Sequence, residues 1–333
     1  MKRRPVLATA LAALGLLLVG CGSPGSGGGK TQPAATGGGG TACAPVAGDQ
    51  LTVLTDDKHL QNSENVVAAF NKEFASAHPA AVQALDAVAQ ALDTSTLIEL
   101  NKAVDVDHKT SSEVAAQFVK DHDLAASDSS AGAGATVVVG TANYSENITL
   151  GEVYAAVLKS AGFSASTQTI GSRETYYPAL VSGSIQVVPE YAASLADFVN
   201  GRINGADAAS IASPDIDTTM AALAPLADAQ GLTLGTASAA QDQNAFAVTT
   251  AFAEQHGVTT LSELAATCGS KLVLAGPPEC PERPFCQVGL EQTYGLRVDQ
   301  FKSYEFALIG QALLHGDATI GVVLSSDGSL AAG

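Results

Sequence analysis

The acidic and glycine-rich segments of this 333-residue chain are where catalytic or phosphate chemistry would be expected, and none of them matches a catalytic motif. Asp56 and Asp57 form an adjacent acidic pair, but the chain has neither the GxSxG turn of serine hydrolases nor the HExxH helix of zinc proteases. The segment from Gly25 to Thr31 is similar to a phosphate-binding loop, but Pro24 stands where that motif needs its first glycine. We therefore predict that the protein is not an enzyme and binds no cofactor.

The first twenty residues have the features of an export signal. Three basic residues at 2–4 precede an apolar run at 6–19, which is too short to cross a membrane that needs about 20 helical residues. The run ends in LVGC, which resembles a bacterial lipobox, so Cys21 is expected to become a lipid-modified N-terminus. We expect a signal peptide at 1–20, a flexible Gly/Ser/Pro-rich tether at 21–50 and anchoring of the protein on the extracytoplasmic face of the cell membrane. The alternative is an ordinary secretory signal with an incidental cysteine.

Four further cysteines follow the leader. An even number of cysteines in an exported chain indicates two disulfides, for which three connectivities exist. Cys280 and Cys286 bracket a proline-rich turn and are the preferred pair, which leaves Cys43 to pair with Cys268. The competing interpretation is a zinc site, but the chain has no CxxC pair and its six histidines are scattered, so we predict no metal.

Charge and composition exclude two classes of protein. The chain has 33 acidic and 16 basic side chains, which give a formal net charge of −17. A nucleic-acid partner is not expected, because phosphate contacts need a Lys/Arg surface. The apolar content of 46% argues against a disordered chain, so most of the sequence is expected to fold.

Alternating strand and helix patterns predict an α/β fold. Before a low-complexity stretch at 125–136, residues 79–92 repeat apolar side chains at helical spacing. After it, residues 137–139 predict a buried strand, and residues 150–161 predict a helix that Gly162 ends. Strands that alternate with helices indicate parallel-rich sheets, and about 280 residues of this kind are expected to form two lobes. Further strands are expected at 185–188, 245–248, 271–274 and 319–324.

Four ordered segments carry a family resemblance. Residues 137–154 (VVVGTANYSENITLGEVY) resemble the opening of the substrate-binding proteins of osmoprotectant ABC importers, which handle glycine betaine, choline and carnitine. Residues 171–194 (GSRETYYPALVSGSIQVVPEYAAS) are similar to a second motif of that family. The sequences TYGL at 293–296 and SSDG at 325–328 match two further landmarks. The resemblance covers essentially all of the chain from Leu51 onward.

The order of these segments differs from that of the family. Residues 51–124 resemble the usual C-terminal portion of the family, but here they come first. We interpret the chain as a circular permutant in which residues 125–136 link the family's usual C-terminus to its usual N-terminus. Lobe 1 is then expected to comprise 51–124 plus 137–240, and lobe 2 to comprise 241–333. The alternative is a separate N-terminal helical domain.

The resemblance implies a type II periplasmic-binding-protein fold, in which two lobes joined by a hinge enclose a ligand in the cleft between them. The implied partners are a small quaternary-ammonium or zwitterionic ligand and the permease and ATPase subunits of an ABC importer, with the membrane reached through the lipid on Cys21. A binding protein of the same fold for another polar cation or amino-acid derivative is an alternative. A surface sensor or scaffold lipoprotein without transport is another.

The family's pocket holds a quaternary ammonium with aromatic rings. Carried over by position, Tyr191 of PEYAAS corresponds to a cage tyrosine, and Ser194 corresponds to a threonine near it. Asn244 and Glu64 stand where the family has two further tyrosines, and the chain has no tryptophan. Asn147, in the first motif, is also assigned to the pocket.

Several polar residues change the character of the expected pocket. Asp242 and Gln61, together with the amide and carboxylate that replace the tyrosines, offer hydrogen-bond acceptors and negative charge. Such a pocket suits a cation with N–H or O–H donors, or a larger zwitterion. Arg283, in the CPERPFC turn, matches an arginine of the family and is expected to clamp a carboxylate. Tyr176 and Tyr177 are each candidates to supplement the cage or to lie in the core.

Overall fold

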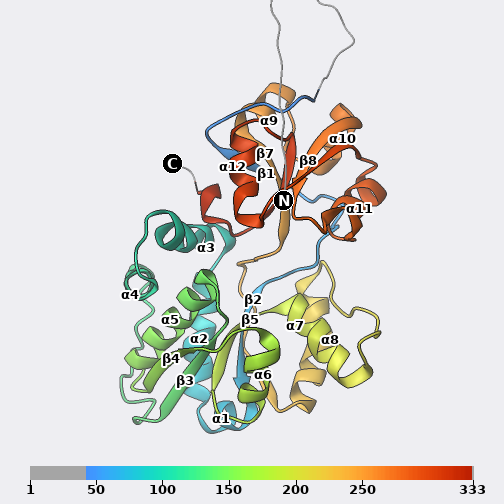
Figure 1. Cartoon of the computed structure of the whole chain (residues 1–333). Coiled ribbons are helices and arrows are strands. Elements are labelled where there is room, and N and C mark those ends of the chain that lie inside the picture. The colour runs from blue at the N-terminus through green and yellow to red at the C-terminus, as the bar shows by residue number, and fades with distance from the viewer. Residues whose placement is uncertain (1–42, 332–333) are drawn as a thin grey trace, which may run out of the picture. The chain divides into compact units, whose positions relative to one another are not determined.

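A computed structural model gives the fold of the protein and describes residues 43–331 (Figure 1). The expected signal peptide, the expected lipidation site Cys21 and residues 21–42 of the expected tether lie outside the described residues. The strands form two five-stranded sheets, and we name the two lobes after them. Lobe 1 comprises residues 66–234, and lobe 2 comprises residues 43–54 and 244–331.

Each sheet is ordered differently from the chain. The lobe 1 sheet consists, in spatial order, of β4 (Ser164–Thr169), β3 (Thr136–Thr141), β5 (Val187–Tyr191), β2 (Val66–Asn71) and β6 (Leu232–Leu234). The lobe 2 sheet consists of β1 (Leu51–Leu54), β7 (Asn244–Thr249), β10 (Ile320–Leu324), β8 (Ser270–Gly276) and β9 (Arg297–Ser303).

Both sheets are mixed, so the expectation of parallel-rich sheets is wrong. β2 runs antiparallel to β5 and β6, and β7 runs antiparallel to β1 and β10. The pairs β3–β4, β3–β5, β8–β9 and β8–β10 are parallel. β2 and β7 each follow directly on a segment that crosses from the other lobe, so they are not held to the parallel direction that a helical crossover gives to consecutive strands.

Helices cover both faces of the lobe 1 sheet. Val66, Ala68 and Phe70 of β2 point into one core, and Ala69 between them points into the other, as expected from the alternation of side chains along a strand. The helices of the first core are α1 (Lys72–Ala77), α2 (Pro79–Ala91), α3 (Thr94–Asn101), α4 (Ser111–Asp121) and α5 (Ser145–Ser160). Those of the second core are α6 (Arg173–Val181), α7 (Ala192–Asn204) and α8 (Ile216–Ala229).

The segment before the low-complexity stretch is part of lobe 1. Leu85 and Val88 of α2 are buried in the same core as Val153 and Val157 of α5, and β2 lies between β5 and β6. A single core therefore joins residues 66–121 to the chain that begins at β3. A separate N-terminal helical domain, the alternative to the permuted fold, is not formed.

Lobe 2 begins earlier in the chain than expected. β1 pairs with β7, so residues 51–54 belong to lobe 2 and the expected start of lobe 1 at residue 51 is wrong. Residues 43–50, expected to be tether, are held by the hydrogen bond from Gly48 N to Leu314 O (3.0 Å) and by that from Thr249 Oγ1 to Val46 O (2.8 Å). Backbone that is bonded to a sheet and helix in this way cannot act as a flexible tether.

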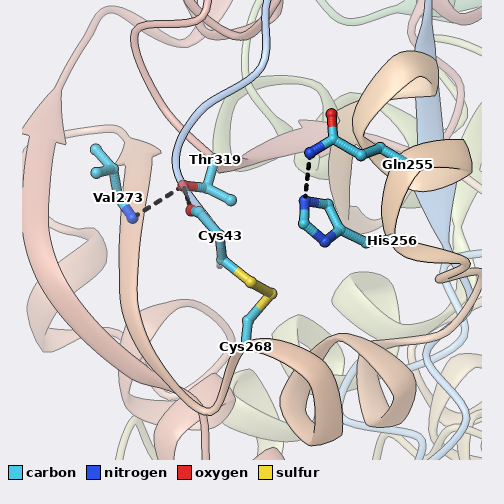
Figure 2. Close-up of a disulfide and its surroundings, with 6 residues drawn as sticks. All are labelled: Cys43, Gln255, His256, Cys268, Val273 and Thr319. Carbon is cyan, nitrogen blue, oxygen red and sulfur yellow. Dashed lines mark hydrogen bonds between the residues drawn. A yellow bond between two sulfur atoms is a disulfide. The ribbon is translucent and has the colours of Figure 1, made fainter. Parts of the chain in front are cut away.

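Both disulfides have the connectivity predicted from the sequence. Cys43 pairs with Cys268 at the end of α10, and Cys280 pairs with Cys286. Figure 2 shows the first pair, with the Thr319 hydroxyl donating to Cys43 O at 2.9 Å. The helices of lobe 2 are α9 (Thr250–His256), α10 (Leu261–Cys268), α11 (Gln287–Gly289) and α12 (Ile309–Leu314). Across the described residues, no helix has the length and apolar character needed to cross a membrane.

Residues 125–136, expected to be a flexible linker, are bonded to the end of α5. Gly132 N donates to Ala161 O (2.7 Å) and Gly134 N donates to Gly162 O (2.9 Å), while Thr136 already belongs to β3. A Cβ at position 132 would lie 2.5 Å from Phe163 N, so only glycine allows the two backbones to approach this closely. The small residues of this stretch serve close packing here and do not make it a loose connection.

Two segments cross between the lobes. Residues 55–65 lead from β1 to β2, and residues 235–243 lead from β6 to β7. The crossings run antiparallel beside each other, because Asn65 pairs with Gln241 and Asp242 N donates to the carbonyl oxygen of Glu64 at 3.0 Å. Two acidic side chains therefore lie at the junction of the lobes.

Candidate functional site

A cavity of about 570 Å³ opens where the crossings meet lobe 1. A second hollow of about 380 Å³ shares Glu64, Ser194 and Asp242 with it, and adds Asn244 and Leu324 from lobe 2. The two hollows are therefore continuous parts of one site that reaches from lobe 1 to lobe 2. Its three tyrosines, all in the larger cavity, are Tyr144, Tyr176 and Tyr191.

Tyr191 is the last residue of β5 and directly precedes α7. Its side chain is 6% exposed, and its hydroxyl donates to Glu146 Oε1 at 2.5 Å. Burial, together with the negative charge of Glu146, raises the pKa of Tyr191, so the phenol stays protonated and acts as a donor. The ring of Tyr144 lies 6.3 Å from that of Tyr191 between centroids, and 44% of Tyr144 is exposed. One buried and one accessible ring thus lie side by side.

An ion pair closes another side of the cavity. Arg173, at the start of α6, donates from Nε and Nη2 to the carboxylate of Glu190 at 2.8 to 3.1 Å. Glu190 is fully buried and also accepts from the Tyr176 hydroxyl at 2.9 Å. Burial alone would lower the pKa of Arg173, but the charge and hydrogen bonds of Glu190 outweigh it and the pKa is raised. The positive charge of Arg173 is therefore permanent, and Glu190 neutralises it locally.

Ser194 connects this ion pair to the first crossing. Its hydroxyl accepts from Arg173 Nη2 at 2.8 Å, and its backbone N–H donates to Glu64 Oε2 at 3.1 Å. Burial raises the pKa of Glu64, although the hydrogen bond from Ser194 and the charge of Arg173 oppose the increase. Glu64 is a cavity carboxylate with no ion-pair partner among the side chains that the structure describes.

A chain of buried polar groups links the cavity to lobe 2. Asn101 Nδ2 donates to Glu146 Oε2 (2.6 Å) and to Ser326 O (2.8 Å), and the Ser326 hydroxyl donates to Asp242 Oδ1 at 2.7 Å. Burial and the charge of Glu146 raise the pKa of Asp242 to about 8, although its bond to Ser326 acts in the opposite direction. Asp242 is therefore largely protonated at neutral pH.

The structure brings together most of the residues that the sequence analysis assigned to a pocket. Tyr191, Ser194, Glu64 and Asp242 line the larger cavity. Asn244 lines the hollow next to it, as does Gln61, whose side chain also donates to Phe285 O at 3.0 Å. Of the two candidate supplementary rings, Tyr176 lines the cavity, whereas Tyr177 packs in the second core of lobe 1.

Two assigned residues lie outside the lining of the larger cavity. Asn147 is fully buried on α5, where its side chain accepts from Ala142 N at 2.7 Å and donates to Pro189 O at 2.9 Å, so both polar ends of the amide are used by backbone. Arg283 lines a third hollow of about 430 Å³ beside the Cys280–Cys286 disulfide, which shares Asn244 and Phe285 with the second hollow. That hollow contains none of the three cavity tyrosines, so Arg283 lies on the lobe 2 side of the site.

Several residues of the site were not assigned from the sequence. Tyr144, Glu146, Arg173 and Glu190 all belong to the two motifs that carried the family resemblance. Only contacts distinguish them from their neighbours, because Glu146 and Asn147 are adjacent on α5 and only Glu146 reaches Tyr191. In the part of the chain that the structure describes, no three His, Cys, Asp or Glu side chains are grouped so that they could hold a metal ion.

Two mixed-sheet lobes joined by two crossings, with a cavity at their junction, define a solute-binding protein of the type II periplasmic-binding-protein class. Residues 44–121 and 135–332 match the family model described as the substrate binding domain of ABC-type glycine betaine transport system, and the chain belongs to this family. Members of the family are transport proteins and not an enzyme class.

Individual relatives match only part of the chain. A glycine-betaine-binding protein from Pseudomonas aeruginosa is 35% identical over 75 residues, which are 22% of this chain and 24% of that protein. This chain therefore spans about a quarter of that relative. A solved glycine betaine/carnitine/choline ABC transporter structure is 16% identical with a TM-score of 0.45, over 59% of this chain and 70% of that one. Apo YehZ from Escherichia coli is 22% identical with a TM-score of 0.48, over 59% and 71% of the two chains.

Proposed function

We propose that this protein is the extracytoplasmic solute receptor of an ABC importer and binds a small quaternary-ammonium osmolyte, such as choline or glycine betaine, in the cavity beside Tyr191. The observation that carries the proposal is the composition of that cavity. Three tyrosines line it together with Glu64 and Asp242, and its one arginine is paired with Glu190.

A quaternary ammonium suits this composition because it carries positive charge without an N–H to donate. Ring faces attract such a cation, and each desolvated contact contributes about 0.5 to 2 kcal/mol. The carboxylate of Glu64, and that of Asp242 once it is ionised, add long-range attraction in a site where the effective dielectric is low. Membership in a family of substrate-binding domains from glycine betaine transport systems supports the same class of ligand.

A second candidate ligand is a polar cation that has N–H or O–H donors. It is favoured by the same two carboxylates, because Glu64 and Asp242 have no basic partner among the described residues. Carboxylate oxygens that face a cavity can accept hydrogen bonds from such a ligand, which a trimethylammonium group cannot donate.

Delivery to a transporter requires partners outside this chain. We propose a permease and an ATPase subunit as partners, and attachment to the extracytoplasmic face of the cell membrane through lipid on Cys21. We also propose that the chain is circularly permuted relative to its family. The support for this is that β1 and β2, at the start of the described chain, complete the two sheets whose other strands come later. The two crossings would then serve as the hinge.

The proposed ligand can be tested at Tyr144. We expect choline and glycine betaine to raise the melting temperature of the purified protein, because a ligand that binds only the folded form stabilises it. Replacing Tyr144 with leucine removes one accessible ring and is expected to weaken binding of choline by about 3- to 30-fold, as the loss of one cation–π contact implies.

The same substitution has a built-in control. Tyr144 is 44% exposed, so Tyr144→Leu should leave the melting temperature without ligand nearly unchanged. Calorimetry on a panel of choline, glycine betaine, carnitine and primary-amine analogues would separate the two candidate ligands. Binding of amines alone would favour the second candidate, and equal affinity for choline in the wild type and the variant would remove Tyr144 from the site.

A further inference from the structure

The two buried tyrosines of the cavity share an unusual environment. Each donates its hydroxyl to a buried carboxylate: Tyr191 to Glu146 at 2.5 Å, and Tyr176 to Glu190 at 2.9 Å. Both carboxylates are nearly inaccessible, with Glu146 5% exposed and Glu190 fully buried. Neither ring therefore presents an ordinary phenol to the cavity, because each is hydrogen-bonded to a negative charge.

The two carboxylates differ in how their charge is balanced. Glu190 forms an ion pair with Arg173 at 2.8 Å, so the pair that accepts the hydrogen bond of Tyr176 has no net charge. Glu146 accepts its second hydrogen bond from the neutral amide of Asn101 at 2.6 Å. No basic side chain forms an ion pair with Glu146 in the described part of the chain. Its negative charge is therefore not balanced by a basic side chain of the described residues, and its carboxylate lies at the hydroxyl end of the Tyr191 ring.

Such a charge changes what the ring can do. A phenol that donates to a carboxylate becomes richer in electron density, because a charge-assisted hydrogen bond polarises the donor. The attraction between a cation and a ring is electrostatic and grows with the negative potential of the ring face. The carboxylate also acts on the cation directly, since charges interact strongly through a dry interior.

Glu146 is not itself among the residues that line the cavity. It therefore does not touch the ligand, and its influence on binding is electrostatic: it polarises the ring of Tyr191, its charge acts on the cation, and it raises the pKa of Asp242. A substitution of Glu146 can therefore change selection by charge without changing the residues that line the cavity, which a substitution of a ligand-contacting carboxylate could not do.

We propose that Glu146 is a specificity-determining residue that acts through the ring of Tyr191 and makes the cavity select a positively charged head group over a neutral one of the same shape. The inference rests on the proposed function and deepens it, because it assigns the charge selectivity to one residue outside the cavity wall. Glu146 is in this sense a positioning and polarising residue.

A pair of isosteric ligands tests the proposal. Choline and 3,3-dimethylbutan-1-ol have the same shape, but only choline is charged. Glu146→Gln keeps a hydrogen-bond acceptor for Tyr191 and removes the charge. We expect this variant to weaken choline binding at least about fivefold and to change binding of the alcohol by less than about twofold. Titrations followed by saturation-transfer NMR measure both ligands, including weak binding.

Two conditions make the comparison clean. The titrations are run at about pH 9, where Asp242 is ionised in the wild type, so that a change in its protonation does not offset the loss of charge at Glu146. The matched control is Glu152→Gln on the same helix, which removes an equal charge. Glu152 accepts from Thr167 at 2.6 Å and lies outside the cavity lining, so this variant should bind both ligands as the wild type does.

The outcomes separate this inference from the proposed function. Equal weakening of choline and the alcohol by Glu146→Gln would show a merely structural role and overturn the inference, as would an unchanged choline affinity. A wild type that binds no quaternary ammonium would overturn the proposed function itself. Should Glu146→Gln fail to fold, Tyr191→Phe removes the same hydrogen bond from the other side, and its expected result is a reduced preference for choline over the alcohol.

Discussion

The affinity for a cationic ligand should increase with pH, and Asp242 sets the size of the effect. Its pKa of about 8 means that, near neutral pH, a cation must displace a proton to gain the charge of this carboxylate. Only about one molecule in eleven is ionised at about pH 7, against about ten in eleven at about pH 9, so the apparent dissociation constant for choline should fall about tenfold over this range.

The sign of the effect follows from the groups around Asp242. Glu146 and Glu64 are the charged groups that raise its pKa alongside burial, and the Ser326 hydroxyl is the donor that lowers it. A bound cation favours the ionised carboxylate, so it lowers the pKa of Asp242 and releases a proton at neutral pH. Binding and proton release are therefore linked, and each measures the other.

Calorimetry in two buffers of different ionisation enthalpy measures this linkage directly. At about pH 7 we expect close to one proton to be released per choline bound, and at about pH 9 close to none. Asp242→Asn, which cannot ionise, should give an affinity that is lower at high pH and nearly independent of pH over this range. A wild-type affinity that stays constant across the range, with no proton released, would refute the assignment of Asp242 to the ligand's electrostatic environment.

Two further predictions concern stability. Replacing Cys43 and Cys268 with serine should lower the free energy of unfolding by about 2 to 5 kcal/mol, and by more than removal of the second disulfide, which spans only 6 residues; chemical denaturation of each variant checks this. Gly132→Ala should destabilise lobe 1 by about 1 to 3 kcal/mol because its Cβ would meet Phe163 N at 2.5 Å. The matched control is Gly201→Ala in α7, where an added Cβ would have no atom within 4 Å. This variant should increase the free energy of unfolding by about 0.5 to 1 kcal/mol in the same assay. A loss of stability as large as that at position 132 would contradict the packing argument.

Helices and strands were predictable from the sequence where apolar residues repeat at a regular spacing and a glycine marks the end of the element. The strand at 137–139 and the helix that Gly162 ends both appear in the structure, as β3 and α5. β2 was not predicted, because its residues VVAAFN are all buried and lack the alternation that distinguishes a strand from a short buried helix. Its place between β5 and β6 depends on partners more than 100 residues away in the chain.

Site residues were predictable only where a family motif fixed their positions. Tyr191 and Ser194 could be assigned because a motif fixed their positions, and both line the cavity. Asn147, which was assigned, is buried and bonded to backbone, whereas Glu146, its neighbour on the same helix turn, was not assigned. Sequence spacing does not distinguish an amide that satisfies backbone groups from a carboxylate that reaches a phenol 45 residues away.

If the proposed lipid anchor holds the protein by its N-terminus, the Cys43–Cys268 bond has a mechanical consequence. Tension that arrives along the chain ahead of Cys43 passes covalently into the end of α10, and so it bypasses the hydrogen bonds of β1. The force would then act on lobe 2 and would reach lobe 1 only through the two crossings. A pull from the membrane would therefore leave the three cavity tyrosines, which belong to lobe 1, in place.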